Sequence, residues 1–412
     1  MRSALVLSRF FPFNQTRVHA VYQRLGTQVA ALAHIADTVR CLFLVPPEQS
    51  RTSEQLSLDE SRLRRLWAPN ITIEISATAD ESTPAGAWAR FGRGIFDFHS
   101  TQIARPTAND PTRTSVRRAL ALAPDIVLVH RLSAMSVLLE ARARTAAPVY
   151  FDLDDLEHVA WARRLVHDPG WRGERLLLLQ TPQILKAELH ALALAQATFV
   201  CSEQDQLRLR RWAPRRPVEV VPNSVEFPPL DLSGPTEPLV AFIGSMGSRP
   251  NAQAVDRLVH EIWPLVIEEV PEARLAIIGG AAENTRAMRA HPPSVTFTGF
   301  VDDLEPWYRK ARVVCCPIFH GSGTRVKIIE AAARARAIVS TPLGAEGLDF
   351  KDGDDILLGN SPAELAERTC RLLKDPMAAA ELGRRARARA AMLYDRQAII
   401  ERLKALFRGR AF

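Results

Sequence analysis

The chain has 412 residues, more than one hydrophobic core usually serves, so we expect two domains. Hydrophobic residues make up 47% and charged residues 24%, the proportions of a globular protein, and no apolar run is long enough to span a membrane. The net charge of +7 suggests nucleic-acid binding, but all except six of the 53 basic residues are arginine, as GC-rich codon usage produces. No basic run alternates with aromatic side chains that stack on bases, so we expect no nucleic-acid partner.

Residues 1–13 contain a short apolar run before Arg9 and no small-residue cleavage site, so we expect no signal peptide and a cytoplasmic chain. The five cysteines are scattered, with neither zinc spacing nor a CxxC pair. We therefore expect buried, inert thiols and no metal site.

Short apolar runs rich in β-branched residues alternate with segments of helical spacing along the whole chain, which predicts βαβ units and parallel sheets. The predicted strands are residues 4–8, 39–45, 125–130, 148–153, 198–202 and 218–223 in the first half, and 239–244, 274–279, 295–299, 312–318, 337–341 and 355–359 in the second. Six strands in each half predict two Rossmann-like, doubly wound α/β domains.

Two segments interrupt this alternation. Residues 226–238 hold four prolines and a glycine, so we expect a linker between the domains there. A chain hinged at such a linker would place the carboxyl ends of both sheets on either side of a cleft, where ligands of open α/β sheets bind. Residues 46–115 are harder to interpret: we expect a helix at 58–68 and a loop at 77–94 that covers part of the cleft.

The most informative segment follows the strand predicted at 312–318. Gly321, Ser322, Gly323 and Thr324 form a glycine-bearing turn, and a helix is predicted from about Arg325 to Ala335. The first turn of such a helix offers unpaired N–H groups and the positive end of the helix dipole, which favours an anion. Arg325 and Lys327 add positive charge where the dipole alone would disfavour it, so we expect an anion site here.

Glu330 lies one and a half turns into this helix, where a carboxylate can accept hydrogen bonds from two vicinal hydroxyls such as those of ribose. The alternative is an ordinary strand, turn and helix with a glutamate on the helix surface. Spacing alone does not decide between these two interpretations.

A second strand-turn-helix junction covers residues 243–255. Gly244 and Gly247 permit a tight turn, and Arg249 stands near the start of the helix, where it can meet a phosphate. Two glycines without a third make no dinucleotide-binding fingerprint, so a nicotinamide-dependent dehydrogenase is not expected.

An acidic cluster and a histidine end two strands of the first half. Asp152, Asp154 and Asp155 close the strand predicted at 148–153, and pairing of such carboxylates raises one pKa at many functional sites. Capping of the following helix by Asp154 or Asp155 explains them equally well. His130 ends the preceding strand, where a lone histidine is more often structural than functional.

Taken together, these segments resemble the retaining glycosyltransferases of family 4, which have the GT-B fold. Residues Gly321 to Glu330 match the pattern GxGTRxKxxE, which one branch of that family carries, at every fixed position. The resemblance covers residues 220–227, 243–255, 271–280, 295–348 and 355–367, and more weakly 125–132, 148–158 and 199–209. It implies an acceptor-side domain at 1–225, a nucleotide-sugar domain at 239–390, and a C-terminal helix at 391–412 that crosses back to the first domain.

Carried over to this chain, the resemblance implies that Glu330 holds ribose hydroxyls and that Arg249 and Lys327 face the diphosphate. Amides of Gly323, Thr324, Arg325 and Val326 would meet sugar and phosphate oxygens, and Gly244 would also be a donor-binding residue. Phe300 and Val301 would lie against the base, and His130 would contact the donor sugar. Ser322 stands where many members have a glutamate that touches the sugar, and Ser245 stands where an arginine is common.

The implied reaction is transfer of a sugar, with retention, from a UDP- or GDP-sugar to a glycan, lipid-linked or small-molecule acceptor, without metal or cofactor. A nucleotide-sugar epimerase of the same fold and a non-catalytic sugar-nucleotide-binding relative are the alternatives. Peripheral contact with the inner face of the membrane through the arginine-rich first half and the C-terminal segment is a further alternative. Against it, Ile399, Ile400, Leu403, Leu406 and Phe407 have the spacing of a core-facing helix.

Overall fold

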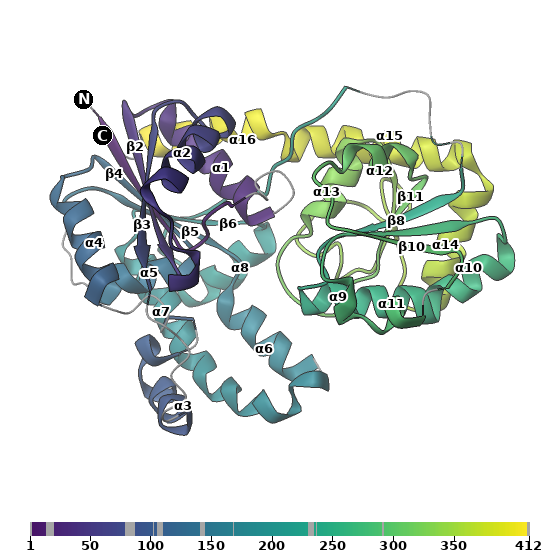
Figure 1. The fold of residues 1–412 in the computed structure, drawn as a ribbon, viewed down its shortest axis with the longest axis horizontal. Coiled ribbons are helices and arrows are strands. Elements are labelled where there is room, and N and C mark those ends of the chain that lie inside the picture. Colours follow the sequence, from purple (N-terminus) through teal and green to yellow (C-terminus); the bar gives the residue numbers. More distant parts are fainter. Residues whose placement is uncertain are drawn as a thin grey trace. The chain divides into compact units, whose positions relative to one another are not determined.

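The computed structural model describes residues 2–13, 20–78, 87–101, 103–104, 110–140, 145–167, 169–229, 235, 237–290 and 292–409. The chain divides into two compact units (Figure 1). Unit 1 comprises Met1–Pro222 with Ala398–Phe412, and unit 2 comprises Asn223–Gln397. The start of the predicted linker at 226 lies four residues past the first division, and residues 230–234 and 236 of that linker are outside the described residues.

Unit 1 contains a seven-stranded parallel sheet in the order β3-β2-β1-β4-β5-β6-β7. Its strands are β1 (Ser3–Ser8), β2 (Thr38–Val45), β3 (Ile71–Ala77), β4 (Ile126–His130), β5 (Val149–Asp154), β6 (Ala197–Val200) and β7 (Val218–Val220). The sequence analysis predicted six of these strands and missed β3. This strand lies at the sheet edge and alternates buried Ile71 and Ile73 with more exposed polar residues, so it lacks the continuous apolar run of a central strand.

The helices of unit 1 lie on both faces of this sheet. They are α1 (Ala20–Ala33), α2 (Ser53–Leu66), α3 (Ala87–Phe96), α4 (Asp110–Ala121), α5 (Arg131–Glu140), α6 (Glu157–His167), α7 (Thr181–Leu194), α8 (Glu203–Trp212) and α16 (Arg396–Gly409), with 3₁₀ turns at Pro47–Gln49, Phe98–Ser100 and Pro169–Gln180. The prediction of a loop at 77–94 was wrong for residues 87–94, which belong to α3. Of its two glycines, Gly94 packs closely, because a Cβ there would come within 2.5 Å of the Gln180 amide, whereas a Cβ at Gly92 would have no atom within 4 Å.

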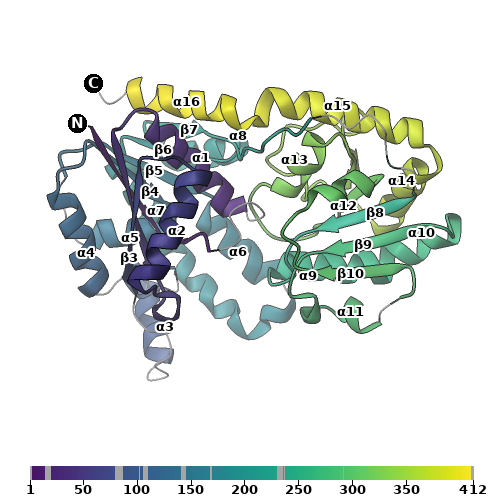
Figure 2. The same cartoon turned by 45° about the horizontal axis from the view of Figure 1, so that its top comes forward.

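Successive residues of β1 alternate between two core clusters, as expected for a strand covered on both faces. Leu5 and Leu7 pack with residues of α4, α5 and α7, whereas Ala4 and Val6 pack with residues of α1 and α16. Helix α16 lies against unit 1 (Figure 2). Its side chains in that second cluster are Ile399, Ile400, Leu403 and Phe407. These four apolar side chains lie in a protein core, as the packing interpretation of the C-terminal segment proposed.

Unit 2 contains a six-stranded parallel sheet in the order β10-β9-β8-β11-β12-β13. Its strands are β8 (Leu239–Ile243), β9 (Arg274–Ile278), β10 (Val295–Gly299), β11 (Val313–Cys316), β12 (Ala337–Ser340) and β13 (Leu357–Leu358). Its helices are α9 (Arg249–Arg257), α10 (Trp263–Glu269), α11 (Arg286–Ala290), α12 (Glu305–Lys310), α13 (Val326–Ala333), α14 (Pro362–Lys374) and α15 (Pro376–Tyr394), with a π turn at Leu258–Ile262 and a 3₁₀ turn at Ala282–Asn284. The two units therefore have the expected doubly wound α/β fold.

The break between α15 and α16 comes at Asp395, later than the boundary expected at 391. Tyr394 is buried, and its hydroxyl accepts a hydrogen bond from the Asp349 amide at 2.7 Å. This anchor holds the last turn of α15 to unit 2. Among the described residues, no helix is both long and apolar enough to cross a membrane.

Candidate functional site

The strand order of unit 2 places one particular pair of loops at the carboxyl edge of its sheet. From the central pair β8 and β11, the chain proceeds outward in opposite directions, which makes this pair the topological switch point. Ligands of open α/β sheets bind at such a point because the two following loops separate there. The loop after β8 carries Gly244, and the loop after β11 carries residues 320–325.

Lys327 and Asn251 bring these two loops together. The Lys327 ammonium donates a hydrogen bond to Asn251 Oδ1 at 2.8 Å, and the Asn251 amide donates to the Ser245 carbonyl, also at 2.8 Å. Lys327 Nζ also lies 4.2 Å from the centre of the Phe242 ring. Because these contacts involve neutral groups, they leave the ammonium charge uncompensated.

Gly244 leaves the room that Lys327 occupies. Its φ of 153° disfavours other residues, and a Cβ added there would lie 2.5 Å from Lys327 Nζ and 2.9 Å from Asn251 Nδ2. The glycine is thus required for the close approach of the lysine to the backbone. Burial, together with the charge of Arg325, lowers the pKa of Lys327 to about 8, against the raising effects of Cys316 and Glu330.

The turn before α13 uses two glycines with positive φ, 117° at Gly321 and 77° at Gly323. Arg325 closes the turn by donating hydrogen bonds to the Ser322 and Gly323 carbonyls, the latter at 2.6 Å. Arg325 is also the N-cap residue of α13, and its side chain makes no capping hydrogen bond. The first amides of this helix therefore lack a side-chain acceptor and can bind an anion.

Thr324 and Glu330 are fixed by residues outside the turn. Asn223 donates a hydrogen bond to Thr324 Oγ1 at 2.7 Å, and Tyr308 donates from its hydroxyl to Glu330 Oε2 at 3.0 Å. Only 8% of Glu330 is exposed, so the interpretation of this residue as a helix-surface glutamate was wrong. A buried carboxylate oriented by a tyrosine hydroxyl can also accept hydrogen bonds from a ligand.

The remaining predicted residues of unit 2 lie at the start of α9, at the start of α13 and after β10. Arg249 is the first residue of α9, and its side chain is exposed. Val326 is the first residue of α13 and is buried. Phe300 is 47% exposed and, with Val301, follows β10 at the edge of the sheet, after Gly299 with its φ of 70°.

In unit 1 the switch point lies between β1 and β4, and Ser8 and His130 end these strands side by side. The Ser8 hydroxyl and His130 Nδ1 are 3.0 Å apart, so they share a hydrogen bond. His130 is fully buried, and its Nε2 atom has no hydrogen-bond partner among the described residues. Burial lowers the pKa of His130 to about 4, so the imidazole is neutral near pH 7.

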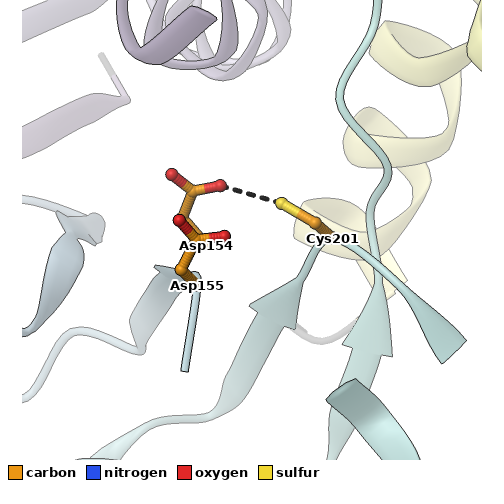
Figure 3. A group of neighbouring side chains, drawn as sticks. All are labelled: Asp154, Asp155 and Cys201. Atoms are coloured by element: carbon orange, nitrogen blue, oxygen red, sulfur yellow. Dashed lines mark hydrogen bonds between the residues drawn. The ribbon is translucent and has the colours of Figure 1, made fainter. Parts of the chain in front are cut away.

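Asp152 and Asp154, at the end of the neighbouring strand β5, are engaged by two arginines and a thiol. Arg24 Nε lies 2.9 Å from Asp152 Oδ2 and 3.3 Å from Asp154 Oδ1. Arg131 binds the other oxygen of Asp154, and the Cys201 thiol donates to Asp154 Oδ1 at 2.8 Å (Figure 3). Two buried carboxylates thus face two guanidinium groups, which balances their charge.

The pKa values in this cluster differ from the expected pattern. Although burial raises the pKa of Asp154, the charges of Arg131 and Arg24 and the Cys201 hydrogen bond hold it well below its usual range. The raised value belongs to Glu157, the first residue of α6, where burial lifts the pKa to about 7 against the opposing charge of Arg131. The expectation that carboxylate pairing raises a pKa among the three aspartates was therefore wrong for Asp154.

Arg131 and Asp154 have positive φ angles of 68° and 63°, which non-glycine residues rarely adopt. Such conformations persist where the surrounding structure enforces them, and they concentrate at functional sites. Asp154, Asp155 and Cys201 hold three potential metal-ligating atoms within 4.8 Å of one another. The group is nevertheless poorly suited to a cation, because Arg24 and Arg131 already bind both oxygens of Asp154. Burial also raises the pKa of the Cys201 thiol well above its usual value.

Sequence reasoning did not identify three residues that organise these sites. Asn251 and Tyr308 position Lys327 and Glu330, and Arg24 binds the aspartates of β5. Asn251 lay inside a segment already singled out, two residues beyond Arg249. Tyr308 and Arg24 carried no local signal, since each reaches its partner across the fold.

Comparison with known proteins associates these sites with a family. Residues 237–375 match the model of a family described as glycosyl transferases group 1. A protein described as an uncharacterized 44.6 kDa protein in the cps region of Klebsiella pneumoniae is 23% identical over 136 residues. That match covers 31% of this chain and 35% of the relative's length.

Solved structures extend the similarity to both units. Sucrose-phosphate synthase from Thermosynechococcus elongatus is similar with a TM-score of 0.71 and 17% identity, over 99% of each chain. Anabaena HepE, solved in complex with UDP and glucose, is similar with a TM-score of 0.67 and 13% identity, over 99% of this chain and all of the other. Residues 237–375 thus match a glycosyl transferases group 1 domain, within a chain that has the two-unit α/β fold of the GT-B glycosyltransferases.

Proposed function

We propose that this chain is a retaining glycosyltransferase of family 4 that moves a sugar from a UDP- or GDP-sugar to a glycan, lipid-linked or small-molecule acceptor. The observation that carries the proposal is the uncapped start of α13, next to the half-buried Lys327 ammonium, at the switch point of unit 2. This combination of backbone donors, helix dipole and uncompensated charge suits a diphosphate. The match to a glycosyltransferase domain supports it.

In this proposal, the diphosphate lies against the first turn of α13. Amides from Gly323 to Val326 donate to its oxygens or to those of the sugar, while Lys327 and Arg249 supply positive charge. Negative charge develops on the leaving nucleoside diphosphate as the glycosidic bond breaks, so donors that are already in place lower the barrier. Lys327 meets that condition because Asn251 and Gly244 fix its position.

Glu330 is proposed to hold the ribose hydroxyls, with Tyr308 keeping one carboxylate oxygen in place. Phe300 is proposed to lie against the base with Val301, since its exposed ring can stack on a planar ligand. Because Ser322 replaces the sugar-contacting glutamate of many relatives, the donor sugar relies more on backbone amides here. His130 remains the predicted sugar contact from the other unit.

We propose that the transfer needs no divalent cation. The residues that could ligate one are Asp154, Asp155 and Cys201, and two arginines already neutralise the aspartate at their centre. In unit 2, Lys327 and the helix dipole supply the charge that a cation would otherwise bring to a diphosphate. A cytoplasmic location is part of the proposal, and contact with the inner face of the membrane is the alternative that the packing of α16 disfavours.

The proposal is tested by incubating the full chain with UDP- and GDP-sugars and measuring release of nucleoside diphosphate, with EDTA in a parallel sample. We expect slow hydrolysis of one donor, acceleration by an acceptor extract, and no effect of EDTA. Glu330→Ala should lose most of this activity, while Glu367→Ala, an exposed glutamate on α14, should retain it.

Two outcomes would contradict the proposal. Conversion of the donor into an isomeric nucleotide-sugar without acceptor would indicate an epimerase. Binding of a nucleotide-sugar without release of nucleoside diphosphate, under every acceptor tried, would indicate a non-catalytic binding protein. An inverted anomeric configuration in the product, determined by NMR, would overturn the retaining mechanism alone.

A further inference from the structure

Three residues end neighbouring strands of the unit 1 sheet in one row. Ser8 pairs with His130 in the register of β1 and β4, and His130 pairs with Asp152 in the register of β4 and β5. Residues paired in this way point to the same face of a parallel sheet, here the face covered by α1 and α16. The three side chains therefore lie side by side at the carboxyl edge, where open α/β sheets bind their ligands.

The hydrogen bonds of Ser8 determine which ring nitrogen of His130 carries the proton. The Phe10 amide donates to Ser8 Oγ at 3.0 Å, and Ser8 Oγ lies 3.0 Å from His130 Nδ1. Ser8 is fully buried, and among the described residues its hydroxyl has no acceptor other than Nδ1. The hydroxyl proton consequently goes to Nδ1, which leaves the proton of the neutral imidazole on Nε2.

The opposite tautomer is disfavoured on both sides of the ring. A proton on Nδ1 would be donated to Ser8 Oγ, so the buried hydroxyl proton of Ser8 would have no acceptor. The lone pair of Nε2 would then face Asp152 Oδ2, which lies 3.8 Å away and belongs to the carboxylate that Arg24 binds. With the proton on Nε2, the same geometry is attractive.

This arrangement leaves one buried donor unused. At 3.8 Å, Asp152 Oδ2 is too far from His130 Nε2 for a hydrogen bond, and Nε2 has no hydrogen-bond partner among the described residues. Buried polar groups without a partner are few in native proteins, and a role in binding or catalysis is one reason why they persist. The next residue, Arg131, has the uncommon φ of 68°, which functional sites often retain.

Serine, histidine and aspartate are also the residue types of a nucleophilic triad, but this row is unsuited to that chemistry. In a triad, the histidine accepts the serine proton and is oriented by a hydrogen bond to the aspartate. Here Asp152 makes no hydrogen bond to the ring and is bound by Arg24 instead. Burial also holds the pKa of His130 at about 4, which makes the imidazole a weak base.

We propose that Ser8 is a positioning residue that fixes His130 in the Nε2–H tautomer, so that Nε2 donates a hydrogen bond to a hydroxyl oxygen of the donor sugar. The sugar contact rests on the proposed function, whereas the tautomer does not. Because Nδ1 is occupied by Ser8, His130 can only donate to its ligand, and the atom that it meets must be an acceptor.

Access to His130 requires a movement, since the imidazole is fully buried in this structure. Phe10 packs edge-on against it, with ring centres 5.7 Å apart, and the Arg131 guanidinium lies 5.2 Å from the centre of the Phe10 ring. Both side chains are partly exposed, so they can move aside without disturbing the core.

The tautomer is tested by heteronuclear NMR of the full chain, isotopically labelled at its ten histidines. His130→Gln identifies the His130 signals by their disappearance. At about pH 7 we expect the chemical shift of a protonated nitrogen at Nε2 and of an unprotonated nitrogen at Nδ1. A protonated Nδ1 would overturn the proposal, because Ser8 would then accept a hydrogen bond from the ring instead of donating one.

Substitution of Ser8 tests its positioning role. In Ser8→Ala we expect the Nδ1–H tautomer to become detectable and kcat/KM for the donor to fall about tenfold, the effect of one buried hydrogen bond. Ser8→Thr keeps the hydroxyl and should restore most of the activity. Ser136→Ala is the matched control: it removes another buried hydroxyl of unit 1, which donates to the Ser133 carbonyl at 2.6 Å, and should change neither measurement. An unchanged tautomer in Ser8→Ala would overturn the positioning role.

Donor analogues that lack one sugar hydroxyl test the contact itself. The analogue without the hydroxyl that meets Nε2 should be a poorer substrate of the parent chain, but Ser8→Ala should cause no further loss with it. If Ser8→Ala lowers kcat/KM equally for every analogue, the sugar contact is overturned. If the parent chain turns over no nucleotide-sugar, the proposed function and the sugar contact are both contradicted, while the NMR result alone decides the tautomer.

Discussion

The two units share one strand order around their switch points but place charge there in opposite ways. In unit 1, Arg24 and Arg131 face Asp152 and Asp154, so the buried charges cancel. In unit 2, Lys327 is held by an amide oxygen, an aromatic face and a glycine turn. The same topology therefore supports a closed ion network in one unit and an open cationic site in the other.

For the proposed function, this difference favours unit 2 as the unit that would bind the phosphate groups. An added anion stabilises a balanced network of charges only slightly, whereas it strongly stabilises an uncompensated ammonium beside an uncapped helix. The neutral His130 is then the group of the unit 1 cluster that remains available for hydrogen bonding, because its Nε2 has no partner among the described residues. Substitutions in the two units should consequently have different consequences, for stability in unit 1 and for activity in unit 2.

The largest effect on stability should come from Arg24→Met. This change leaves Asp152 buried without its main partner, and removing one member of a buried ion pair costs about 3–5 kcal/mol. The unfolding transition measured in urea should shift accordingly. Arg118→Met is the control: Arg118 pairs with Glu74, but 68% of its side chain is exposed, so we expect a change of less than about 1 kcal/mol. Equal effects of the two substitutions would contradict the balanced-network interpretation.

The largest effect on activity should come from Lys327→Ala. Loss of a charge that stabilises the leaving diphosphate should raise the barrier by about 3 kcal/mol, which is about 100-fold in rate. Steady-state release of nucleoside diphosphate measures this. Lys374→Ala provides the comparison, since Lys374 is an exposed lysine paired with Glu269 and should retain full activity. A loss below about threefold would place the diphosphate elsewhere.

The fold was largely predictable because central strands of parallel sheets are continuous apolar runs. Twelve strands of the two sheets were recognised in this way, while the edge strand β3 has the alternating polarity of a half-buried strand. Helix α3 was missed for a different reason: its two glycines are typical of a loop, and the close packing of Gly94 against Gln180 explains one of them. Local sequence cannot show such an approach between distant segments.

The site was predictable where one segment holds all its parts. Gly321 to Glu330 form a single turn and helix, so their spacing together with the family resemblance singled them out as candidates. The positions of Lys327 and Glu330 depend on Asn251 and Tyr308, which come from 76 and 22 residues away. The charge balance of unit 1 likewise depends on Arg24 meeting Asp152 across 128 residues. Residue types were visible in the sequence, but these pairings were not.

A smaller effect should follow from Gly244→Ala, which tests whether the glycine turn positions Lys327. The new Cβ would lie 2.5 Å from Lys327 Nζ, so the ammonium must move, and we expect about a tenfold rise in KM for the donor, or about 1.4 kcal/mol. Gly353→Ala introduces backbone strain at a φ of 80° with no atom within 4 Å, so it controls for strain alone. If both variants lose activity equally, then strain rather than displacement of Lys327 is the cause.

The smallest effect is a pH dependence of nucleotide binding that belongs to unit 2. Because the pKa of Lys327 is about 8, half of its charge is lost at that pH, and UDP affinity should fall about twofold there and further toward pH 9. The effect of Lys327 on folding stability has the opposite pH dependence. In the unfolded chain the lysine stays protonated up to about pH 10.4, so the free energy of unfolding rises between about pH 8 and pH 10.4. Titration calorimetry with UDP should show the loss of affinity in the parent chain. In Lys327→Arg, the charge persists at every pH in this range, and the loss should disappear. If the UDP affinity of Lys327→Arg falls with pH as it does in the parent chain, another group titrates in this range. The charge of Lys327 would then no longer explain the difference between the two units.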